Sequence, residues 1–379
     1  MASEEPSPDV RLVDLFAGPG GLDVAATWLG IRALGVEWDD DACATREAAG
    51  LLTVSDDVRR LVPSDLPTAT ILTAGPPCQT FTIAGAGNGR RALQKVLAMI
   101  GRLDRGENVK KDLGALDDER TGLVLEPLRW LLEAERAGHP YEAVVLEQVP
   151  AVLPVWKSIE IVLNRHGYHT DVGVLGTEEY GVPQTRRRAL LLAHRRHRPR
   201  LPSPTHRAYR RGVARDQGDD QLQPWETMSG VVARASDFVA VSNYGTNGDP
   251  ADRGRRSSEE PAATITGKVG RVRLEGEGIS GTAGRLSPAE AGRLQTFPLD
   301  YPWSGKNQGQ QIGNAIPPRL GAHALAAVLG LTLPPALLDN CVNESWSPEV
   351  REGTLDRLLP RPVRDDFFDR SSEPTLFSH

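Results

Sequence analysis

The stretch VRLVDLFAGPGGLDVAATWLG, residues 10–30, decides the fold of the N-terminal half of the chain. It consists of an apolar run (10–16), a glycine-rich turn (18–21) and a pattern with helical spacing. This succession predicts a strand, a turn and a helix. In an open α/β sheet, the carboxyl end of such a strand and the start of the helix face one crevice, where ligands bind. The stretch therefore predicts a ligand site at the edge of a parallel sheet.

Apolar runs continue to alternate with helical patterns along the first half of the chain. Helical patterns such as DDDACATREAAG separate the runs. This rhythm is typical of βαβ units, so we expect an α/β fold: a Rossmann-like domain with a mainly parallel sheet and helices on both faces. The further strand candidates are IRALGVE (31–37), TATILTAG (68–75), YEAVVLE (141–147) and RALLLA (188–193).

The chain changes character near residue 200. Residues 200–284 hold short β-branched pieces such as DFVAVSNYG and PAATITGKVGRV among glycine and charged clusters, which predicts a small irregular domain that contains strands. Helical patterns return in residues 285–331, so we expect the chain to re-enter the first domain (10–199) there. Residues 332–379 are charged and interrupted by prolines, and we treat them as a C-terminal appendage whose role the sequence does not indicate.

Charge is distributed unevenly along the chain. The 379 residues are 39% hydrophobic and 25% charged, with a formal net charge of -6, which argues against a protein that coats nucleic acid indiscriminately. Between His194 and Arg215, however, the chain holds eight arginines and no acidic residue. Such a basic stripe predicts a phosphate-binding footprint, and a solvated arginine-rich loop is the alternative.

Cysteine usage and hydropathy bear on the compartment. The three cysteines, Cys43, Cys78 and Cys341, are too few and too scattered for a disulfide framework or a thiolate metal site, and their odd number fits a reducing compartment. The sequence has no run of about 18 apolar residues, and its start, MASEEPSPDV, lacks the basic and apolar segments of a secretory signal. We therefore expect a cytoplasmic protein without membrane contact and without a bound metal.

The glycine-rich turn is a candidate cofactor site. Glycines 18, 20 and 21 let the backbone turn sharply and approach a ligand without a Cβ clash. Glu37 ends the second strand candidate, where a carboxylate can accept hydrogen bonds from ribose hydroxyls. The pair predicts a nucleoside cofactor. The alternative is a turn that needs glycine only for its shape, with Glu37 at a helix N-terminus.

The segment GPPCQTFT (75–82) contains the candidate nucleophile. It follows an apolar run and so lies at the carboxyl end of a strand, and its two prolines restrict the backbone before Cys78. A polar loop beside arginines favours the thiolate, which is the attacking species. We interpret Cys78 as a catalytic nucleophile rather than as a small buried apolar side chain.

Further polar groups also fall at strand ends. Glu147 ends the run YEAVVLE, and alternation along QTRRR (184–188) points its first, third and fifth side chains, including Arg186 and Arg188, to one face. Asn314 directly precedes a helical pattern. Each has a structural alternative: a capped strand-end acid, a solvated row of arginines, a turn-forming asparagine. Together they supply an acid, an anion-binding pair and part of a nucleoside pocket.

In their order and spacing these segments resemble the cytosine-C5 DNA methyltransferase family, over nearly all of Arg11–Leu331. DLFAGPGGLD is similar to the family's first cofactor motif and GPPCQTFT to its catalytic Pro-Cys loop. The resemblance implies a Rossmann-like methyltransferase domain, with residues 200–284 as the target-recognition domain. The other segments that carry it are DERTGLVLEPLRWL, QTRRRALLLA, RLSPAEAGRLQTFP and QIGNAIPP.

The resemblance also implies a mechanism. A methyl group would pass from S-adenosyl-L-methionine to C5 of a cytosine flipped out of double-stranded DNA. Cys78 would attack C6, Glu147 would hydrogen-bond N3 of the ring, and Arg186 would help position the thiol and the base. After methyl transfer, C5 would lose its proton and Cys78 would leave. Arg188 and Gln79 complete the implied catalytic set.

By the same resemblance, the cofactor pocket draws on distant parts of the chain. Phe16 would meet the adenine face, Glu37 the ribose hydroxyls and Asp57 the adenine amino group. Asn314 would lie near the methionine carboxylate. Gly18 and Gly20 would admit the methionine portion, and the remaining members of the pocket would be Gly21, Trp38 and Pro77.

Two features depart from the family pattern. The family usually has Glu-Asn-Val where this chain has Glu-Gln-Val, with Gln148 in the middle. Glutamine keeps the amide and adds a methylene, and we expect Gln148→Asn to retain or raise activity. The interval between Cys78 and Glu147 also includes an enlarged loop, about residues 90–117, which we expect to cover the DNA.

Two rival functions stay open at this stage. One is methylation of tRNA, because Thr-Phe-Thr after Gln79 resembles a tRNA-specific branch of the family. The other is a catalytically silent DNA-binding regulator with the same fold. The sequence does not indicate which bases surround the target, since readout depends on side-chain placement in the grooves. We expect a monomer, with a cognate restriction endonuclease as a further partner if the role is restriction rather than phage defence or gene regulation.

Overall fold

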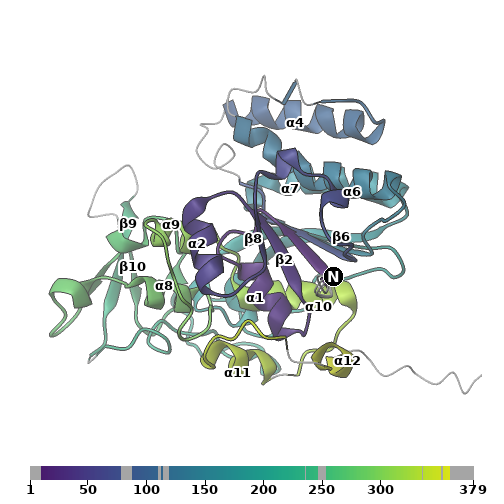
Figure 1. Ribbon diagram of the computed structural model, residues 1–379. Coiled ribbons are helices and arrows are strands. Elements are labelled where there is room, and N and C mark those ends of the chain that lie inside the picture. Colours follow the sequence, from purple (N-terminus) through teal and green to yellow (C-terminus); the bar gives the residue numbers. More distant parts are fainter. Residues whose placement is uncertain are drawn as a thin grey trace, which may run out of the picture.

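A computed structural model describes residues 10–77, 88–109, 112–113, 119–234, 236–245, 253–334, 336–350 and 353–358. Figure 1 shows a layered α/β part with a smaller part beside it, which carries β9 and β10. The predicted catalytic residues Cys78 and Gln79 lie outside the described residues. So do several positions of the predicted loop at 90–117 and the end of the C-terminal appendage. The loop prediction is wrong for the first part of that segment, which belongs to the helix α4 (Asn88–Asp104). This helix packs against α7 (Leu153–Arg165) because Val96, Met99 and Ile100 are buried.

A seven-stranded sheet forms the centre of the described structure, in the order β3-β2-β1-β4-β5-β8-β6. The first five strands are parallel to one another, and β8 runs antiparallel to both of its neighbours. The predicted α/β fold with a mainly parallel sheet is confirmed. The strands are β1 (Leu12–Leu15), β2 (Ala33–Glu37), β3 (Thr53–Ser55), β4 (Ile71–Ala74), β5 (Ala143–Gln148), β6 (His169–Gly176) and β8 (Arg187–His194).

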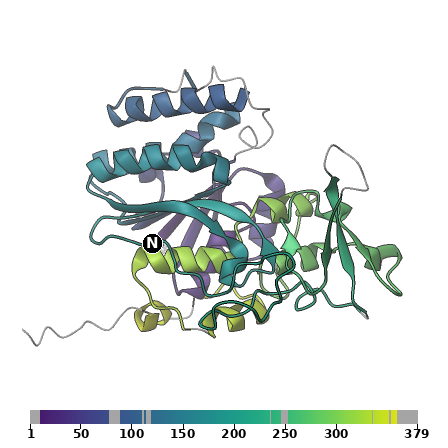
Figure 2. The ribbon, with the colours of Figure 1, turned by 180° about the vertical axis from the view of Figure 1, so that it is seen from behind.

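Helices cover both faces of this sheet. Figures 1 and 2 show α4, α6 and α7 on one face and α1 and α10 on the other. Helix α2 packs beside β3, and the turn η3 (Glu119–Leu125) leads into α6. The helices are α1 (Gly21–Trp28), α2 (Asp40–Ala48), α4 (Asn88–Asp104), α6 (Glu126–Arg136), α7 (Leu153–Arg165) and α10 (Pro318–Leu329).

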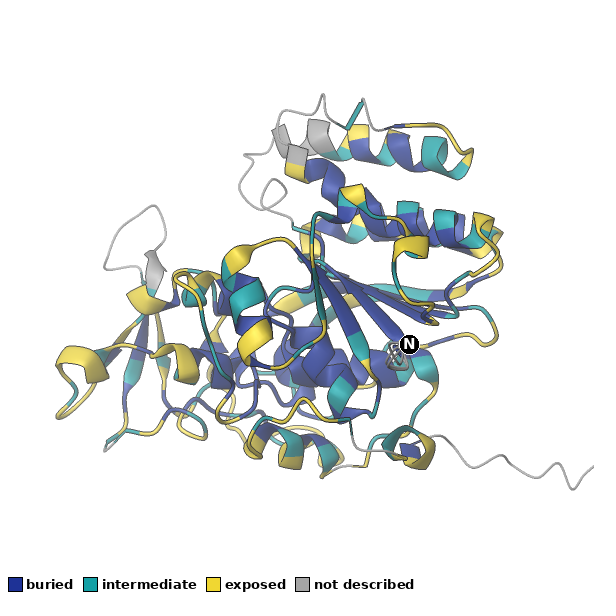
Figure 3. Cartoon of the chain, in the orientation of Figure 1, coloured by how far each residue is buried: buried dark blue, intermediate teal, exposed yellow. Residues whose placement is uncertain are grey.

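Alternation along the strands divides the core into two layers. In β5, Val144 and Leu146 contribute to the core under α6 and α7, whereas Ala143 and Val145 contribute to the core with α1 and α10. Successive side chains of a strand point to opposite faces, so a strand covered on both faces must be apolar throughout. This is why the central strands read as continuous apolar runs, and Figure 3 shows them buried.

The smaller part contains a three-stranded antiparallel sheet in the order β10-β9-β12. A parallel pairing of β11 with β7 joins this part to the segment directly before β8. Its own core includes Met228, Phe238, Leu274 and Ile312. The elements are β7 (Gln184–Thr185), β9 (Val239–Gly245), β10 (Arg253–Ser257), β11 (Ala262–Ala263), β12 (Arg273–Glu275), α8 (Pro288–Leu294) and α9 (Gln308–Asn314).

The described part of the C-terminal appendage packs against the first domain. It contains α11 (Leu337–Asn343) and α12 (Thr354–Leu358), which lie below α10 and α1 in Figure 1. Leu338, Val342 and Leu358 are buried in the same core as those two helices. Within the described residues, no helix combines the length and apolar character that a membrane span needs.

Candidate active site

The carboxyl ends of β1, β2, β4 and β5 meet around a cavity of about 450 Å³. Residues from η3 and from the segment 307–316 complete its wall. Ends of parallel strands meet at one edge of a sheet, which is why side chains far apart in the chain converge here. The predicted site residues that line this cavity are Phe16, Gly18, Gly21, Glu37, Trp38, Pro77, Glu147, Arg186, Arg188 and Asn314.

The turn after β1 exposes backbone to this cavity. Phe16 has a φ of 60°, in the left-handed region that aromatic residues seldom adopt, and Gly18 has a φ of 53°. A Cβ added to Gly18 would meet nothing within 4 Å. The turn therefore presents the α-carbon of Gly18 to open space, where a ligand can approach the backbone closely.

Glu37 holds this turn in place. Its Oε2 accepts a hydrogen bond from the Gly18 amide at 2.7 Å, and its Oε1 accepts from the Trp38 and Asp39 amides, both at 2.8 Å. A carboxylate offers about four acceptor positions, so three are already filled. Glu37 can thus accept one hydroxyl from a ligand at Oε2 while it ties the end of β2 to the glycine turn.

Two predicted cofactor residues do not line the cavity. A Cβ on Gly20 would clash with Leu51 Cδ1 and would lie 2.9 Å from the Tyr301 hydroxyl. Protein side chains therefore fill the space that a Cβ of Gly20 would need, and a contact of its backbone with the ligand stays a prediction. Asp57 caps the turn after β3, and its carboxylate accepts hydrogen bonds from the backbone and the guanidinium of Arg59.

Asp14 is a further polar residue of the cavity wall, and it was not among the predicted site residues. It lies within β1, is 1% exposed, and accepts a hydrogen bond from Thr73 Oγ1 at 2.6 Å. Burial, and then the negative charge of nearby Asp23, raise the pKa of Asp14 well above its usual value. The Asp23 carboxylate itself pairs with Arg46 at 2.8 Å. An acid inside an apolar run was the only signal in the sequence for this group.

The other end of the cavity holds the predicted acid. Glu147 is 6% exposed, and its Oε1 lies 2.6 Å from Nε of Arg188, which β8 brings alongside. Arg187, between the two predicted arginines, is exposed. The alternation that we expected along QTRRR therefore holds, and it delivers Arg188 to the acid.

Gln148 connects this acid to the predicted Pro-Cys loop. Its Nε2 donates a hydrogen bond to the Pro76 carbonyl, and its Oε1 accepts one from the Val149 amide at 2.5 Å. The side chain is buried. Gln148 thus fixes the backbone two residues before Cys78 to the end of β5.

Arg186 joins three parts of the chain rather than pairing with the acid. Its guanidinium donates to the carbonyls of Ile265 and Gly313, both at 2.9 Å, and of Ala315 at 3.2 Å. It is 1% exposed, and burial followed by the charge of Arg188 lowers its pKa. Gln184 Oε1 accepts from the amide of the same Ile265 at 3.0 Å. Gln184 and Arg186 therefore attach the smaller domain to the sheet.

Asn314 and its neighbours form the far wall of the cavity. Its Oδ1 accepts a hydrogen bond from Gln310 Nε2 at 2.9 Å, so the group that it offers to a ligand is its NH₂. Arg120 and Leu123, from η3, also line the cavity. Neither was predicted from the sequence, where this segment indicated only a helix before the acid.

The arginine stripe 194–215 does not form one basic surface. The stripe starts at the end of β8, where the Arg195 amide donates a hydrogen bond to the Glu142 carbonyl. Glu142 directly precedes β5, so this part of the stripe lies at the amino end of that strand, whereas the cavity lies at its carboxyl end. A phosphate-binding footprint in this stripe stays a prediction, and the first part of the stripe lies away from the cavity. Carboxylates pair with Arg195, Arg196, Arg207 and Arg215, and they belong to Glu135, Glu142, Asp220 and Glu226 respectively.

A larger cavity, of about 970 Å³, lies between α10, α11 and residues 202–206. Its buried arginines are engaged by protein: Arg319 pairs with Asp339, and Arg293 donates to the carbonyls of Phe297 and Val342. Its lining includes neither the glycine turn nor the strand-end acids. Size alone therefore does not identify the active site.

The C-5 cytosine-specific DNA methylase family matches the chain over residues 10–100, 112–211 and 205–329. The chain belongs to this family. It is thus a DNA (cytosine-5-)-methyltransferase, and S-adenosyl-L-methionine is the methyl donor of the family.

Type II methyltransferases are among its relatives. The chain is 25% identical to the Type II methyltransferase M.NgoFVII of Neisseria gonorrhoeae, over 82% of this chain and 83% of the relative. It is 26% identical to the Type II methyltransferase M1.HphI of Haemophilus parahaemolyticus, over 84% of this chain and 86% of the relative.

Solved methyltransferase structures share the fold of this methylase. The S. pombe Dnmt2 methyltransferase superposes with a TM-score of 0.57 at 17% identity, over 85% of this chain and 98% of that chain. The Entamoeba histolytica methyltransferase EhMeth gives 0.55 at 12% identity, over 86% and 99% of the two chains. These likenesses support the fold, whereas the activity follows from the family.

Proposed function

We propose that this methylase transfers a methyl group from S-adenosyl-L-methionine to C5 of a cytosine flipped out of double-stranded DNA, with Cys78 as the covalent nucleophile. One observation carries the proposal. A single cavity joins a glycine turn held by Glu37 to the Glu147–Arg188 pair, and Pro77, directly before Cys78, lines it as well. A methyl donor and a base could therefore meet beside the loop that carries the thiol.

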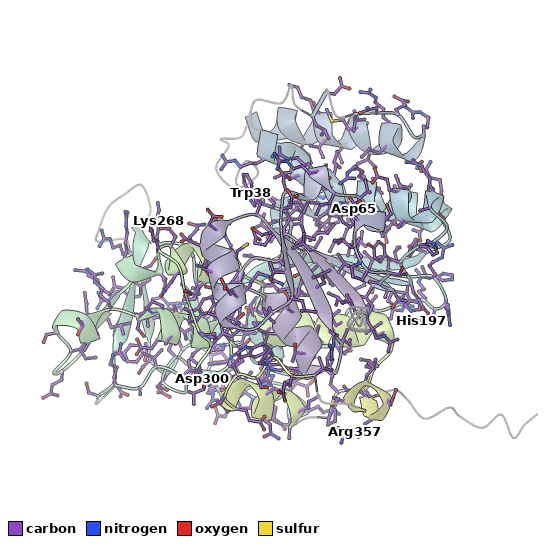
Figure 4. The ribbon with its side chains drawn as sticks, in the orientation of Figure 1. Trp38, Asp65, His197, Lys268, Asp300 and Arg357 are labelled. Atoms are coloured by element: carbon purple, nitrogen blue, oxygen red, sulfur yellow. The ribbon has the colours of Figure 1, made fainter. Side chains whose placement is uncertain are left out.

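The glycine-turn end fits the methyl donor. Trp38, labelled in Figure 4, is 61% exposed at the rim and offers a ring face to adenine, as does Phe16. Glu37 would accept one ribose hydroxyl, and the NH₂ group of Asn314 would donate to the methionine carboxylate. When bound, the donor supplies an electrophilic methyl group on its sulfonium.

At the other end, the side chains of the protein would activate the cytosine. The Cys78 thiolate would form a bond to C6, and the electron pair of the C5–C6 double bond would become available at C5. Glu147 would hydrogen-bond N3 and stabilise the charge that develops on the ring, while Arg188 holds the carboxyl group in position. After C5 has gained the methyl group, loss of its proton and breakage of the S–C6 bond restore the ring and the thiolate.

The target base must leave the helix to reach this cavity. Unstacking costs about a few kcal/mol, which contacts to the DNA must offset. The smaller domain beside the cavity, about residues 200–284, would supply these contacts, and its attachment through Arg186 and Gln184 would hold it at the correct distance. We propose double-stranded DNA as the partner of a monomeric enzyme. The Type II names of the relatives support a cognate restriction endonuclease.

A trapped adduct would test the nucleophile directly. In the presence of S-adenosyl-L-methionine, duplex DNA that contains 5-fluorocytosine should form an adduct with the wild-type protein that survives denaturation, because after methyl transfer C5 carries fluorine in place of the proton that must leave. Cys78→Ala should form none while it still binds S-adenosylhomocysteine. An adduct with Cys78→Ala would exclude Cys78 as the nucleophile.

The substrate class needs a separate measurement. Methyl transfer to duplex DNA and to tRNA should be compared under the same conditions, with DNA as the expected acceptor. Transfer to tRNA alone would overturn the proposed substrate, and absence of transfer to both would indicate a silent DNA-binding protein. Bisulfite sequencing of DNA from expressing cells would then report the target sequence.

A further inference from the structure

The C-terminal strap, residues 332–358 where described, lies beyond the family match, which ends at residue 329. Its helices α11 and α12 contribute to the core of the first domain. Arg293 donates to the Val342 carbonyl and, at 2.7 Å, to Asn343 Oδ1. The strap is thus a fixed part of the fold, and its contacts lead towards the cofactor end of the cavity.

Trp346 is the central contact of the strap. Its Nε1 donates to the Ala49 carbonyl at 2.9 Å, and its amide donates to Asp300 Oδ1 at 2.6 Å. Asp300 is labelled in Figure 4. The indole ring lies 5.5 Å from the ring of Tyr301, at 66°. Trp346 therefore connects the end of α2 to the segment that carries Tyr301.

Tyr301 carries the connection to the glycine turn. It is 5% exposed, and its ring packs at 4.7 Å from Phe297 and 5.1 Å from Trp303. Its hydroxyl donates a hydrogen bond to the Pro19 carbonyl, between the two glycines of the turn. Burial raises the pKa of this hydroxyl, so it remains a donor across the working pH range. The space next to it is available because Gly20 has no Cβ.

Residues 306–311 also form hydrogen bonds with α2, the helix that begins shortly after Glu37 and Trp38. Thr45 Oγ1 donates to Gln311 Oε1 at 2.6 Å, and Asp41 accepts from the Lys306 amide at 2.8 Å. Together with the Trp346 bond to Ala49, these contacts immobilise the helix on one side of the cofactor end. Tyr301 immobilises the turn on the other side.

We infer that Tyr301 and Trp346 are positioning residues for the methyl donor. The strap holds Trp346, the indole holds the Tyr301 ring, and the Tyr301 hydroxyl holds the Pro19 carbonyl and with it the open face of Gly18. Because the turn is ordered before the ligand binds, the free energy of binding does not include the cost of ordering it. This inference rests on the proposed cofactor site, and neither residue touches the ligand.

Binding of S-adenosylhomocysteine, measured by calorimetry, tests the first link. Tyr301→Phe removes only the hydroxyl and should weaken binding about fivefold, the usual size for one lost hydrogen bond. The rate at saturating donor should change less than twofold, because the base end is untouched. Hydrogen exchange of residues 16–21 in the ligand-free protein should become faster.

Tyr180→Phe is a matched control. The Tyr180 hydroxyl is also buried and donates to a proline carbonyl, that of Pro202 at 2.7 Å, in another part of the molecule. This variant should lose a similar amount of thermal stability and keep its affinity for S-adenosylhomocysteine. Equal loss of affinity in both variants would indicate general destabilisation and would overturn the inference.

A double-mutant cycle tests the link from the strap. Trp346→Ala should weaken binding about threefold in the wild type, but less than twofold when Tyr301 is already Phe, because both changes break the same connection. If the two substitutions instead weaken binding by independent factors that multiply, Trp346 does not act through Tyr301. An unchanged affinity of Tyr301→Phe would refute the whole inference. Failure of the wild type to bind S-adenosylhomocysteine would instead refute the proposed cofactor site.

Discussion

The two ends of the cavity are built by different kinds of contact. At the cofactor end, Glu37 accepts hydrogen bonds from the amides of residues 18, 38 and 39, and the most distant of these is 19 positions away in the chain. At the base end, Gln148 reaches Pro76 across 72 positions, and Arg186 reaches Gly313 across 127 positions. The carboxylate at the cofactor end thus bonds nearby residues, with Tyr301 added from far along the chain, whereas the base end depends entirely on long-range pairing.

This difference separates two tasks. The cofactor end contains the glycine turn that faces the methyl donor, so changes there should affect affinity for the donor. The base end exists only when β5, β8 and the smaller domain are assembled, so changes there should affect the rate of transfer. The predictions below test this separation, from the largest expected effect to the smallest.

Glu147→Gln should have the largest effect. The variant keeps the shape of the side chain but removes the acid at N3 and the charge that faces Arg188, and we expect the rate of methyl transfer to fall about a thousandfold. Single-turnover transfer of a tritiated methyl group measures this rate. Affinity for S-adenosylhomocysteine should be unchanged, and a parallel loss of affinity would show that the two ends are not separable.

Glu37→Ala should produce the converse result. Three amides lose their acceptor and the turn loses its tie to β2, so we expect the Kd for S-adenosylhomocysteine to rise about a hundredfold. The rate at saturating donor should stay within about threefold of the wild type. Glu37→Gln keeps one acceptor oxygen, so its Kd for S-adenosylhomocysteine should lie between those of the wild type and of Glu37→Ala. If saturating donor failed to restore the rate, the cofactor end would also serve the chemistry.

Gln148 gives a smaller effect at the base end. Removing its bond to the Pro76 carbonyl with Gln148→Ala should lower the single-turnover rate about tenfold, with little change in donor affinity. The sequence led us to expect that Gln148→Asn retains or raises activity. The structure revises this expectation, because asparagine must bridge Pro76 and Val149 with one methylene less. We now expect a rate between those of wild type and Gln148→Ala, and a gain would restore the earlier hypothesis.

The smallest effect concerns stability and lies outside both ends. In the larger cavity, burial lowers the pKa of His206 to about 4 and that of His323 to about 3. A lowered pKa means that the folded protein favours the neutral form of each histidine. The resulting contribution to the free energy of unfolding is fully present above about pH 6.5, the ordinary pKa of histidine, and is lost as the pH falls towards the pKa of the folded state.

The free energy of unfolding should therefore decrease between about pH 6.5 and 4. His323→Gln removes one group that takes up a proton on unfolding. The slope of this decrease should therefore become smaller by up to about 1.4 kcal/mol per pH unit. Urea unfolding at several pH values measures it, with His139→Gln as the control, since His139 is exposed. An unchanged slope in His323→Gln would assign the pH dependence to other groups.

Much of the fold could be predicted from local patterns. The runs at 31–37, 141–147 and 188–193 became β2, β5 and β8, because buried strands require continuous apolar residues. Local patterns did not predict β3, which has three residues, or β6, whose side chains are mostly half-buried at the edge of the sheet. Edge strands lack the two-sided burial that makes a strand visible in the sequence.

The sequence by itself determined the strand–turn–helix unit of residues 10–30, the placement of Glu37 and Glu147 at strand ends, and the face shared by Arg186 and Arg188. These follow from the period of two along a strand and from where apolar runs stop, which are properties of neighbouring residues. Tertiary structure alone decided that Arg188 meets Glu147 while Arg186 attaches the smaller domain, that Tyr301 lies beside Gly20, and that the strap reaches the glycine turn through Trp346. Each of these depends on which distant segment packs against the residue, and no local pattern carries that information.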